Sequence, residues 1–407
     1  MQNFIKQLNK KHEKMHPFAV GFFEVNFKNL EENILKIQEK NKQINNKIKY
    51  LLPVKGGGYG CGMIEISKFV QEKKSVDYLG VAHLQEAFEL RKSGIHLPIL
   101  VLGQTQYSEK FLDFIAKENI EIAISEIETF LKIEEYFKKY LDKNNQKISV
   151  HIKIDLGMGR CGVLEKDFFE LFKKIQNSNF IQIKGVMMHF PVSDSDISDK
   201  KNFEYTEFQI QKFSKIKQKI KNICENSKNI IFHTSNSGGA TEHKNSVFDM
   251  IRPGIASYGY PEPGSGAENL GLKPVVKIYS YFTLLKKFPK NFSIGYGRTY
   301  FTKQPNEIIG ILPVGYADGL NRLLSNKYSV FSEQKNEYKC VGRISMDQSA
   351  YLISDNIDVK ELQQQKIYIL NENQNAREIA QKLNTISYEV LIRFGTSERL
   401  RKIYLYE

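Results

Sequence analysis

The sequence lacks several features that mark whole classes of protein. It contains no tryptophan, and its four cysteines, Cys61, Cys161, Cys224 and Cys340, form no CxxC pair. Their wide separation predicts reduced thiols in a cytoplasmic protein and argues against a disulfide-built fold or a metal site. No apolar run approaches the ~20 residues of a transmembrane helix, and the first 15 residues show no secretion signal. We therefore expect a cytoplasmic protein with no membrane partner.

Arginine is also scarce. The chain carries 59 basic residues and a net charge of +13, but only 10 of those residues are arginine. The most basic stretch, residues 211–222, places Phe213, Ile216 and Ile220 at helical spacing, which predicts a helix with a solvated lysine face. No basic and aromatic residues interleave, so nucleic-acid binding is not predicted. Each remaining arginine is therefore a stronger candidate for a specific role, because a site can require the planar fork of hydrogen-bond donors that lysine lacks.

Residues 46–259 alternate short apolar runs with amphipathic helical patterns. The β-like runs are residues 49–54, 77–82, 98–102, 120–124, 148–155, 183–190, 229–235 and 250–259. Between most of them lie helical patterns, such as those at 63–74, 83–94 and 167–177. Eight strands with intervening helices predict an α/β fold, a (βα)8 TIM-type barrel, with a doubly wound sheet as the alternative. A further helix at 27–40 is expected to cover the barrel.

The pattern changes after residue 260. Residues 261–274 are rich in proline and glycine, which predicts a linker. Residues 275–407 carry short strand-like runs, with one helix near 376–384, and predict a mostly-β C-terminal domain. We expect the barrel to occupy residues 14–260. The strand-like segment 18–26 fits either domain.

Candidate catalytic groups follow the predicted strands, because barrel enzymes place them at the carboxyl ends of strands. Lys55 follows an apolar run and precedes the glycine-rich turn GGGYGCG. A lysine partly desolvated there becomes a nucleophilic amine, although a surface lysine is the ordinary alternative. The turns at 235–239 (SNSGG) and 252–256 (RPGIA) can present backbone N–H groups to a phosphate. A lysine opposite a phosphate cradle suggests pyridoxal phosphate.

At this point the sequence resembles the alanine racemase family. The resemblance is carried by eight segments that occur in the family's order between about residues 18 and 404. These are PVKGGGYGCG, KIDLGMGRCG, HTSNSGGA, IRPGIASYG, IGYGRTY, PVGYADGLNRLLSN, VGRISMDQ and ISYEV. The resemblance implies a (βα)8 barrel followed by a β domain. It also implies a homodimer in which each active site combines the barrel of one chain with the C-terminal domain of the other.

The resemblance also implies catalytic and cofactor-binding residues. Lys55 would hold pyridoxal 5'-phosphate and act as one of two bases. Tyr296 would be the opposite base, contributed by the second chain. The cofactor-binding positions would be Lys55, Tyr59, His189, Asn236, Ser237, Arg252, Gly254, Ile255 and Tyr388, with Arg252 facing the pyridine nitrogen. From the residues alone, His189 could equally be a satisfied core histidine, and Arg252 an ion-pair partner.

The substrate positions implied by the resemblance lie in both predicted domains. Arg160 and Met346 match groups near the substrate carboxylate, and Tyr316 and Arg322 match the entrance to the site. Arg160 could also be a structural ion-pair partner. Lys153 matches a position that carries a carbamate in some members, and an unmodified lysine paired with Asp155 is an equal alternative.

Three positions depart from the family's usual pattern. Gly56–Gly58 replace Ala-Asn-Ala, which we expect to loosen the loop; Leu156 replaces threonine, and Ser345 replaces a frequent cysteine. These departures leave the substrate range open. About 17 additional N-terminal residues have no role that the sequence predicts.

The predicted activity is therefore interconversion of L-alanine and D-alanine by a two-base mechanism, supplying D-alanine for peptidoglycan. An amine and a phenol have ordinary pKa values of about 10.4 and 10, so both need lowering to act near neutral pH. The main alternative is a racemase of broader or different amino-acid specificity. A barrel-fold amino-acid decarboxylase and a non-catalytic pyridoxal-binding protein are further alternatives, which the C-terminal motifs disfavour.

Overall fold

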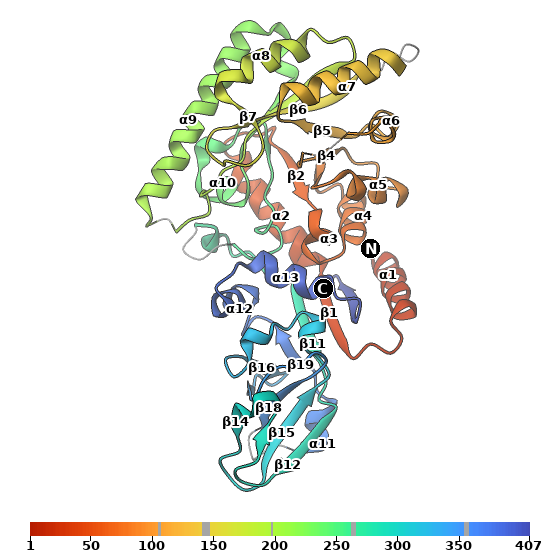
Figure 1. Cartoon of the computed structure of the whole chain (residues 1–407), viewed down its shortest axis with the longest axis vertical. Helices are drawn as coiled ribbons and strands as arrows, with labels where there is room; N and C mark the ends of the chain where they lie inside the picture. The colour runs from red at the N-terminus through yellow and green to blue at the C-terminus, as the bar shows by residue number, and fades with distance from the viewer. Residues whose placement is uncertain (105–106, 141–146, 197, 262–265, 354–357) are drawn as a thin grey trace. The chain divides into compact units, whose positions relative to one another are not determined.

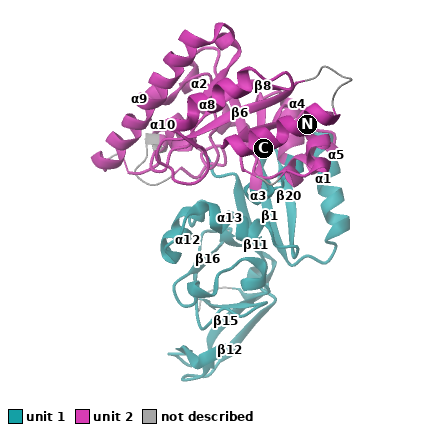
Figure 2. Ribbon diagram, turned by 45° about the horizontal axis from the view of Figure 1, so that its top comes forward, with its two compact units in different colours: residues 1–30, 56–65, 273–407 teal, residues 31–55, 66–272 magenta. Residues whose placement is uncertain are grey.

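The computed structural model of the chain describes residues 1–104, 107–140, 147–196, 198–261, 266–353 and 358–407 (Figure 1). These residues form two compact units, coloured separately in Figure 2. The barrel unit consists of residues 31–55 and 66–272. The sheet unit consists of residues 1–30, 56–65 and 273–407. The predicted boundaries at 14–260 and 275–407 stay a prediction.

The barrel unit contains eight parallel strands in the order β10-β2-β3-β4-β5-β6-β8-β9. They are β2 (Lys49–Pro53), β3 (Tyr78–Val81), β4 (Ile99–Val101), β5 (Glu121–Ile124), β6 (Ile148–Asp155), β8 (Ile181–Met187), β9 (Ile231–His233) and β10 (Met250–Ile251). The two ends of this order are joined by backbone hydrogen bonds, from Asp249 N–H to Phe232 O (2.9 Å) and from Arg252 N–H to Ser235 O (2.8 Å). The predicted barrel is confirmed, and a doubly wound sheet is excluded.

One helix precedes the first barrel strand, and helices follow most of the barrel strands. They are α2 (Phe27–Lys42), α4 (Met63–Lys73), α5 (Leu84–Lys92), α6 (Glu109–Lys117), α7 (Ile127–Tyr140), α8 (Glu165–Gln176), α9 (Lys200–Ile223) and α10 (Ser237–Glu242). The lysine-rich helix is α9, which Asp199 caps by accepting from Asn202 N–H. Its Phe213, Ile216 and Ile220 are buried as predicted, because the apolar stripe at i, i+3 and i+7 faces the barrel. The short strand β7 (Val163–Leu164) pairs with β6.

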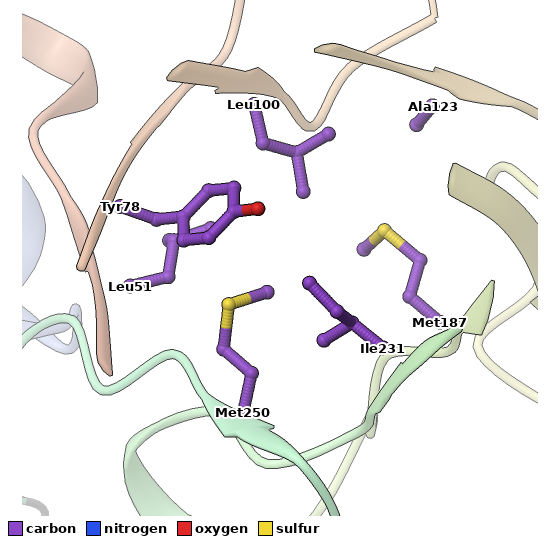
Figure 3. Packing of buried hydrophobic residues seen from close by; sticks show 7 residues of the cluster. All are labelled: Leu51, Tyr78, Leu100, Ala123, Met187, Ile231 and Met250. Atoms are coloured by element: carbon purple, nitrogen blue, oxygen red, sulfur yellow. The ribbon is translucent and has the colours of Figure 1, made fainter. Parts of the chain in front are cut away.

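The barrel interior is filled by side chains that converge from the strands (Figure 3). Seven buried residues form this cluster: Leu51, Tyr78, Leu100, Ala123, Met187, Ile231 and Met250. Each of the seven comes from a different strand. Their side chains meet in the interior because alternate residues of a barrel strand point inward. Strand β6 contributes the buried polar residue His151. The interior is therefore a packed core that fixes where the strand ends lie.

The sheet unit is built on a nine-stranded sheet in the order β12-β15-β18-β17-β16-β19-β11-β1-β20. Its strands are β1 (Gly21–Asn26), β11 (Val276–Ser280), β12 (Leu284–Phe288), β15 (Glu307–Leu312), β16 (Ser329–Ser332), β17 (Glu337–Cys340), β18 (Ser349–Ile353), β19 (Ile367–Leu370) and β20 (Leu400–Leu405). The segment that fitted either domain is β1, which lies between antiparallel β11 and parallel β20. A two-stranded ribbon, β13 (Ser293–Ile294) with β14 (Tyr300–Phe301), completes the β structure. The mostly-β character of this part is confirmed.

Helices in the sheet unit are more numerous than predicted. The expected helix is α12 (Ala376–Leu383), which begins at the capping residue Asn375 and ends at left-handed Asn384. The structure adds α1 (Gln2–Met15), α11 (Val359–Gln364) and α13 (Ser387–Gly395). The expectation of a single helix after residue 275 is thus wrong: Asp358 caps α11, and the apolar face of α13 buries Val390, Leu391 and Phe394.

Short 3-10 helices connect the main elements. They are η1 (Glu225–Asn229), η2 (Lys244–Ser246), η3 (Gly266–Leu270), η4 (Tyr296–Arg298), η5 (Tyr316–Asp318) and η6 (Arg322–Leu324). Within the predicted linker, η3 is ordered, whereas residues 262–265 lie outside the described residues. None of the helices in the described ranges combines the length and apolar character needed to cross a membrane.

Candidate active site

The carboxyl ends of the barrel strands share one rim, and several predicted site residues follow them. Lys55 lies just beyond β2 and Arg160 follows β6. His189, Asn236 and Arg252 follow β8, β9 and β10. The parallel order of the strands therefore brings side chains that are far apart in the sequence to one end of the barrel.

The Lys55 amine is partly desolvated and lies near two arginines. Solvent reaches part of its side chain, but the protein packed around the amine lowers the Lys55 pKa below its usual value. The nearby Arg160 and Arg252 lower this pKa further, while Glu86 opposes them. The amine is thus more readily deprotonated than that of an ordinary surface lysine, which suits a nucleophile or a base.

Arg160 lies in a loop whose backbone is fixed by Asp155. The Asp155 carboxylate accepts four backbone N–H groups, those of Gly157 (2.8 Å), Met158 (2.8 Å), Gly159 (3.1 Å) and Arg160 (3.0 Å). These hydrogen bonds lower the pKa of Asp155 although partial burial opposes them. The carboxylate therefore acts as a loop anchor, and the side chain of Arg160 projects from a fixed backbone.

Lys153 does not show the pairing with Asp155 that the sequence left open. Its amine donates to the backbone carbonyl of Leu102 (3.1 Å), and the residue is buried. Burial lowers the Lys153 pKa to about 8; the neighbouring Cys161 opposes this shift, and Arg160 and Arg252 add to it. A buried amine with such a pKa is partly neutral near physiological pH and can react with carbon dioxide.

Arg252 ends a buried chain of hydrogen bonds. One terminal nitrogen contacts His233 Nδ1 (2.8 Å), and the other donates to the carbonyls of Met188 (2.8 Å) and Thr234 (3.0 Å). His233 Nε2 contacts His151 Nδ1 (2.7 Å), and His151 Nε2 contacts a carboxylate oxygen of Glu121 (2.7 Å). Burial lowers the Arg252 pKa to about 9, so the guanidinium stays charged at neutral pH.

The two histidines near Arg252 are held neutral. Burial lowers the pKa of His233 well below its usual value, and Arg252 adds to this effect. Burial likewise lowers the pKa of His189, followed by the charges of Arg252, Arg160, Lys153 and Lys55. The sequence did not single out His151, His233 or Glu121 as site residues. The available signal was weak: His151 shares the inward face of β6 with Lys153 by strand alternation.

The SNSGG and RPGIA turns meet at Ser237. The Ser237 hydroxyl oxygen accepts the backbone N–H groups of Gly254 (3.0 Å) and Ala256 (3.2 Å). Asn236 caps α10 by accepting from Gly239 N–H (3.0 Å), and it also accepts from the Ser193 hydroxyl (2.7 Å). The structure therefore brings Asn236, Ser237, Gly254 and neighbouring Ile255 together at one place on the rim, and we call this group the Ser237 cradle.

Within the sheet unit, the turn after Lys55 winds in the left-handed sense. Gly56, Gly57 and Gly58 have φ angles of 62°, 65° and 67°, and Tyr59 follows at 55°. Backbone N–H groups of Gly60 and Gly62 close the turn on the carbonyls of Gly56 (3.0 Å) and Gly57 (2.8 Å). Glycine adopts this conformation without the penalty that side chains incur. The three glycines thus form a defined turn, and the expected loosening of this loop stays a prediction.

Tyr59 and Tyr388 are brought together in the sheet unit. Their rings lie 5.8 Å apart at an angle of 40°. Tyr388 lies on α13, and the turn packs closely against this helix, because a Cβ on Gly60 would lie 2.6 Å from the Leu391 carbonyl oxygen. Burial raises the pKa of Tyr59 well above its usual value, so the phenol keeps its proton as a hydrogen-bond donor.

Tyr296 and Met346 line one hollow of the sheet unit, together with Arg343 and Ser345. Tyr296 is 71% exposed and Met346 53% exposed, which is unusual for side chains this apolar. Tyr316 N–H donates to the carbonyl of Ser345 (3.1 Å), so the Tyr316 turn is joined to the Met346 loop.

Arg399 reinforces this junction. Its guanidinium contacts Asp318 (3.1 Å) in the turn that carries Tyr316 and Asp347 (2.6 Å) beside Met346. Arg322 is exposed on η6, a few residues further along the chain. The predicted residues thus form two groups, one on the barrel rim and one in the sheet unit.

Comparisons with known proteins give a consistent result. Two family models match, the alanine racemase N-terminal domain over residues 25–262 and the alanine racemase C-terminal domain over residues 275–404. The chain is 36% identical to an alanine racemase of Thermodesulfovibrio yellowstonii over 94% of this chain and 97% of that protein. It is 31% identical to an alanine racemase structure from Clostridium difficile 630, with a TM-score of 0.84 and 96% of each chain covered. A structure of the same racemase in complex with cycloserine gives a TM-score of 0.82, with the same identity and coverage.

Proposed function

Because this chain belongs to the alanine racemase family, we propose that it is an isomerase that interconverts L-alanine and D-alanine. The observation that carries the proposal is the rim of the barrel unit. There Lys55 with its lowered pKa, the Ser237 cradle and Arg252 follow the ends of parallel strands. The proposed product, D-alanine, would serve peptidoglycan synthesis in the cytoplasm.

The residues on the rim fit pyridoxal 5'-phosphate. Ser237 and the backbone around Gly254 and Ile255 would hold the phosphate. The family resemblance adds Tyr59 and Tyr388 as phosphate-binding positions. Arg252 suits the pyridine nitrogen, because it has only donors and all three of its described side-chain partners are neutral acceptors. His189 and Asn236 would border the ring. The cofactor, held by Lys55, would supply an electrophilic carbon that takes up the substrate amine as the lysine amine is released, and a conjugated ring that withdraws electrons from the α-carbon.

Two bases would exchange the α-proton. The Lys55 amine would hold or release a proton on one face of the α-carbon, and the Tyr296 hydroxyl would do so on the other. Arg160 and Met346 would orient the substrate carboxylate, while Tyr316 and Arg322 would line the entrance. The strong exposure of Tyr296 and Met346 supports a homodimer in which a second chain covers them.

The activity is tested by incubating the purified enzyme, loaded with pyridoxal 5'-phosphate, with L-alanine and following D-alanine formation. Lys55→Ala and Tyr296→Phe are each expected to lower the rate at least about a hundredfold, since each removes one acid–base group. Lys68→Ala is the matched lysine control. If the loaded enzyme racemises no amino acid, or releases carbon dioxide from its substrate instead, the proposal is wrong.

The substrate range needs a wider panel. Ser345 lies in the hollow that holds Tyr296 and Met346, and it departs from the family's usual residue. L-serine, L-arginine and L-lysine should therefore be tested beside L-alanine. A kcat/KM for another amino acid that equals or exceeds the value for alanine would establish a broader or different racemase.

A further inference from the structure

Helix α1 precedes residue 25, where the family match begins, yet it is an integral part of the sheet unit. Its residues Leu8 and His12 are buried, and the helix packs against β20, the last strand of the nine-stranded sheet. Phe4 stacks on Phe27 (6.5 Å), which in turn stacks on Tyr404 (5.1 Å). The helix therefore covers the edge of β20.

Asn9 provides a specific link between α1 and this edge. Its amide nitrogen donates to the carbonyl of Tyr404 (2.9 Å), and its amide oxygen accepts the Tyr404 N–H (2.8 Å). These two bonds reproduce those that a neighbouring strand would make with an edge strand. Because β20 pairs with β1 on its other side, Tyr404 is fixed from both sides.

The Tyr404 side chain reaches the chain segment that follows Lys55. Its ring is fully buried, and its hydroxyl donates to the carbonyl of Cys61 (3.2 Å). The approach is close, since a Cβ on Gly62 would lie 2.4 Å from this hydroxyl oxygen. Gly62 also has a φ angle of 101°, so both space and backbone conformation require glycine there.

A second link runs from α1 to Glu65 in the same segment. The Glu65 carboxylate lies 3.5 Å from His12 Nε2 and 3.5 Å from Lys11 Nζ. Burial of this carboxylate opposes its ionisation, but the neighbouring His12 and the charge of Lys11 help to lower the Glu65 pKa to about 2. Two independent links thus tie residues 61–65 to the helix.

We propose that α1 is an intramolecular brace that positions the Lys55 turn, with Asn9, Tyr404 and Glu65 as positioning residues. The role of Lys55 rests on the proposed function. The brace compensates for a feature of this chain: Gly56–Gly58 have no side chains to anchor the turn. Holding the segment after the turn at Cys61 and Glu65 limits how far its backbone can move.

The test is amide hydrogen exchange of residues 56–65 in the full-length protein. Asn9→Ala and Tyr404→Phe each remove hydrogen bonds from the brace, and each is expected to speed exchange of this segment about three- to tenfold. Lys10→Ala, an exposed neighbour of Asn9, is the matched control and should exchange like the wild type. Asn9→Gln keeps the amide and should restore part of the protection.

A second measurement separates positioning from general stability. The two variants should release pyridoxal phosphate faster on dilution, while exchange in β15 and β18, which lie far along the same sheet, stays unchanged. If exchange at 56–65 stays at the wild-type rate in both variants while β20 exchanges faster, α1 only protects a strand edge and the proposal is wrong. Exchange is measured without turnover, so failure of the proposed racemase activity leaves this result interpretable.

Discussion

At the scale of single residues, the guanidinium of Arg252 orders a buried hydrogen-bond chain that ends at Glu121. Arg252 has only donors, so His233 Nδ1 accepts and the His233 proton resides on Nε2. That proton is donated to His151 Nδ1, and His151 donates from Nε2 to Glu121. The direction of every bond in the chain is therefore determined, which holds Arg252 in one orientation.

Glu121→Ala is expected to lower the free energy of unfolding by about 1–3 kcal/mol, because His151 Nε2–H loses its buried acceptor. Glu121→Gln keeps a carbonyl acceptor, so it should lower the free energy of unfolding less than half as much as Glu121→Ala. Urea-induced unfolding measures both losses. Tyr78→Phe is the control, since it removes only the longer bond to the other Glu121 oxygen (3.3 Å). Equal losses for Glu121→Ala and Tyr78→Phe would contradict the ordered chain.

Lys153 offers a test that depends on pH. Its pKa of about 8 predicts that the reactive neutral amine increases as pH rises from 7 to 9. With ¹³C-labelled bicarbonate, we expect a carbamate NMR signal that grows over this range and is absent in Lys153→Met. A signal that persists in Lys153→Met would assign the modification to another lysine.

Some residues of this site could be predicted from the sequence, and others could not. Lys55 and Arg252 stand beside glycine-rich turns, so their positions were informative. His151, His233 and Glu121 lie within apolar strands, where nothing in the residue pattern separates a buried polar chain from an ordinary strand residue. Tyr296 was predicted only through the family resemblance, because the chain contains 21 tyrosines.

At the scale of elements, the left-handed turn after Lys55 explains why three glycines occur together. Gly57 has a φ angle of 65°, and a Cβ at this position would meet no atom within 4 Å, so Gly57→Ala changes backbone preference alone. We expect it to cost about 1 kcal/mol of unfolding free energy. Gly57→Asn should cost less, since asparagine tolerates this conformation.

Gly60→Ala provides the steric comparison for that prediction. Its Cβ would lie 2.6 Å from the carbonyl oxygen of Leu391, so it should cost more than Gly57→Ala. Thermal unfolding of the three variants should give the order Gly60→Ala, Gly57→Ala, Gly57→Asn, from largest loss to smallest. A loss for Gly57→Asn as large as that for Gly57→Ala would show that the turn does not limit stability through its φ angles.

Element prediction succeeded where periodicity was clear and failed where it was not. The eight barrel strands and α9 were predicted because apolar residues repeat at strand or helix spacing. Helix α13 was missed although ISYEV, which lies within and just before it, was recognised as a motif. Helix α1 was missed because its mostly polar residues bury only Leu8 and His12.

At the scale of the whole molecule, the proposed homodimer can be tested by subunit exchange. Lys55→Ala and Tyr296→Phe proteins are each expected to be inactive. If one site uses Lys55 of one chain and Tyr296 of the other, a mixed dimer contains one complete site. Activity should return to about a quarter of the wild-type value when half of the dimers are mixed. Verified exchange without recovery would overturn the shared site.

The position of β1 has a consequence for how the protein is made. β1 is completed by Asn26, but its sheet partners β11 and β20 are completed only at Ser280 and Leu405. At about 5–20 residues per second, a ribosome needs on the order of 20–80 s to travel from β1 to the end of β20. During that interval the barrel strands can pair with one another, while β1 remains an apolar strand that is not paired with β11 or β20. Synthesis therefore makes the sheet unit the last part to fold, and a stalled ribosome would leave β1 exposed to aggregation or chaperone binding.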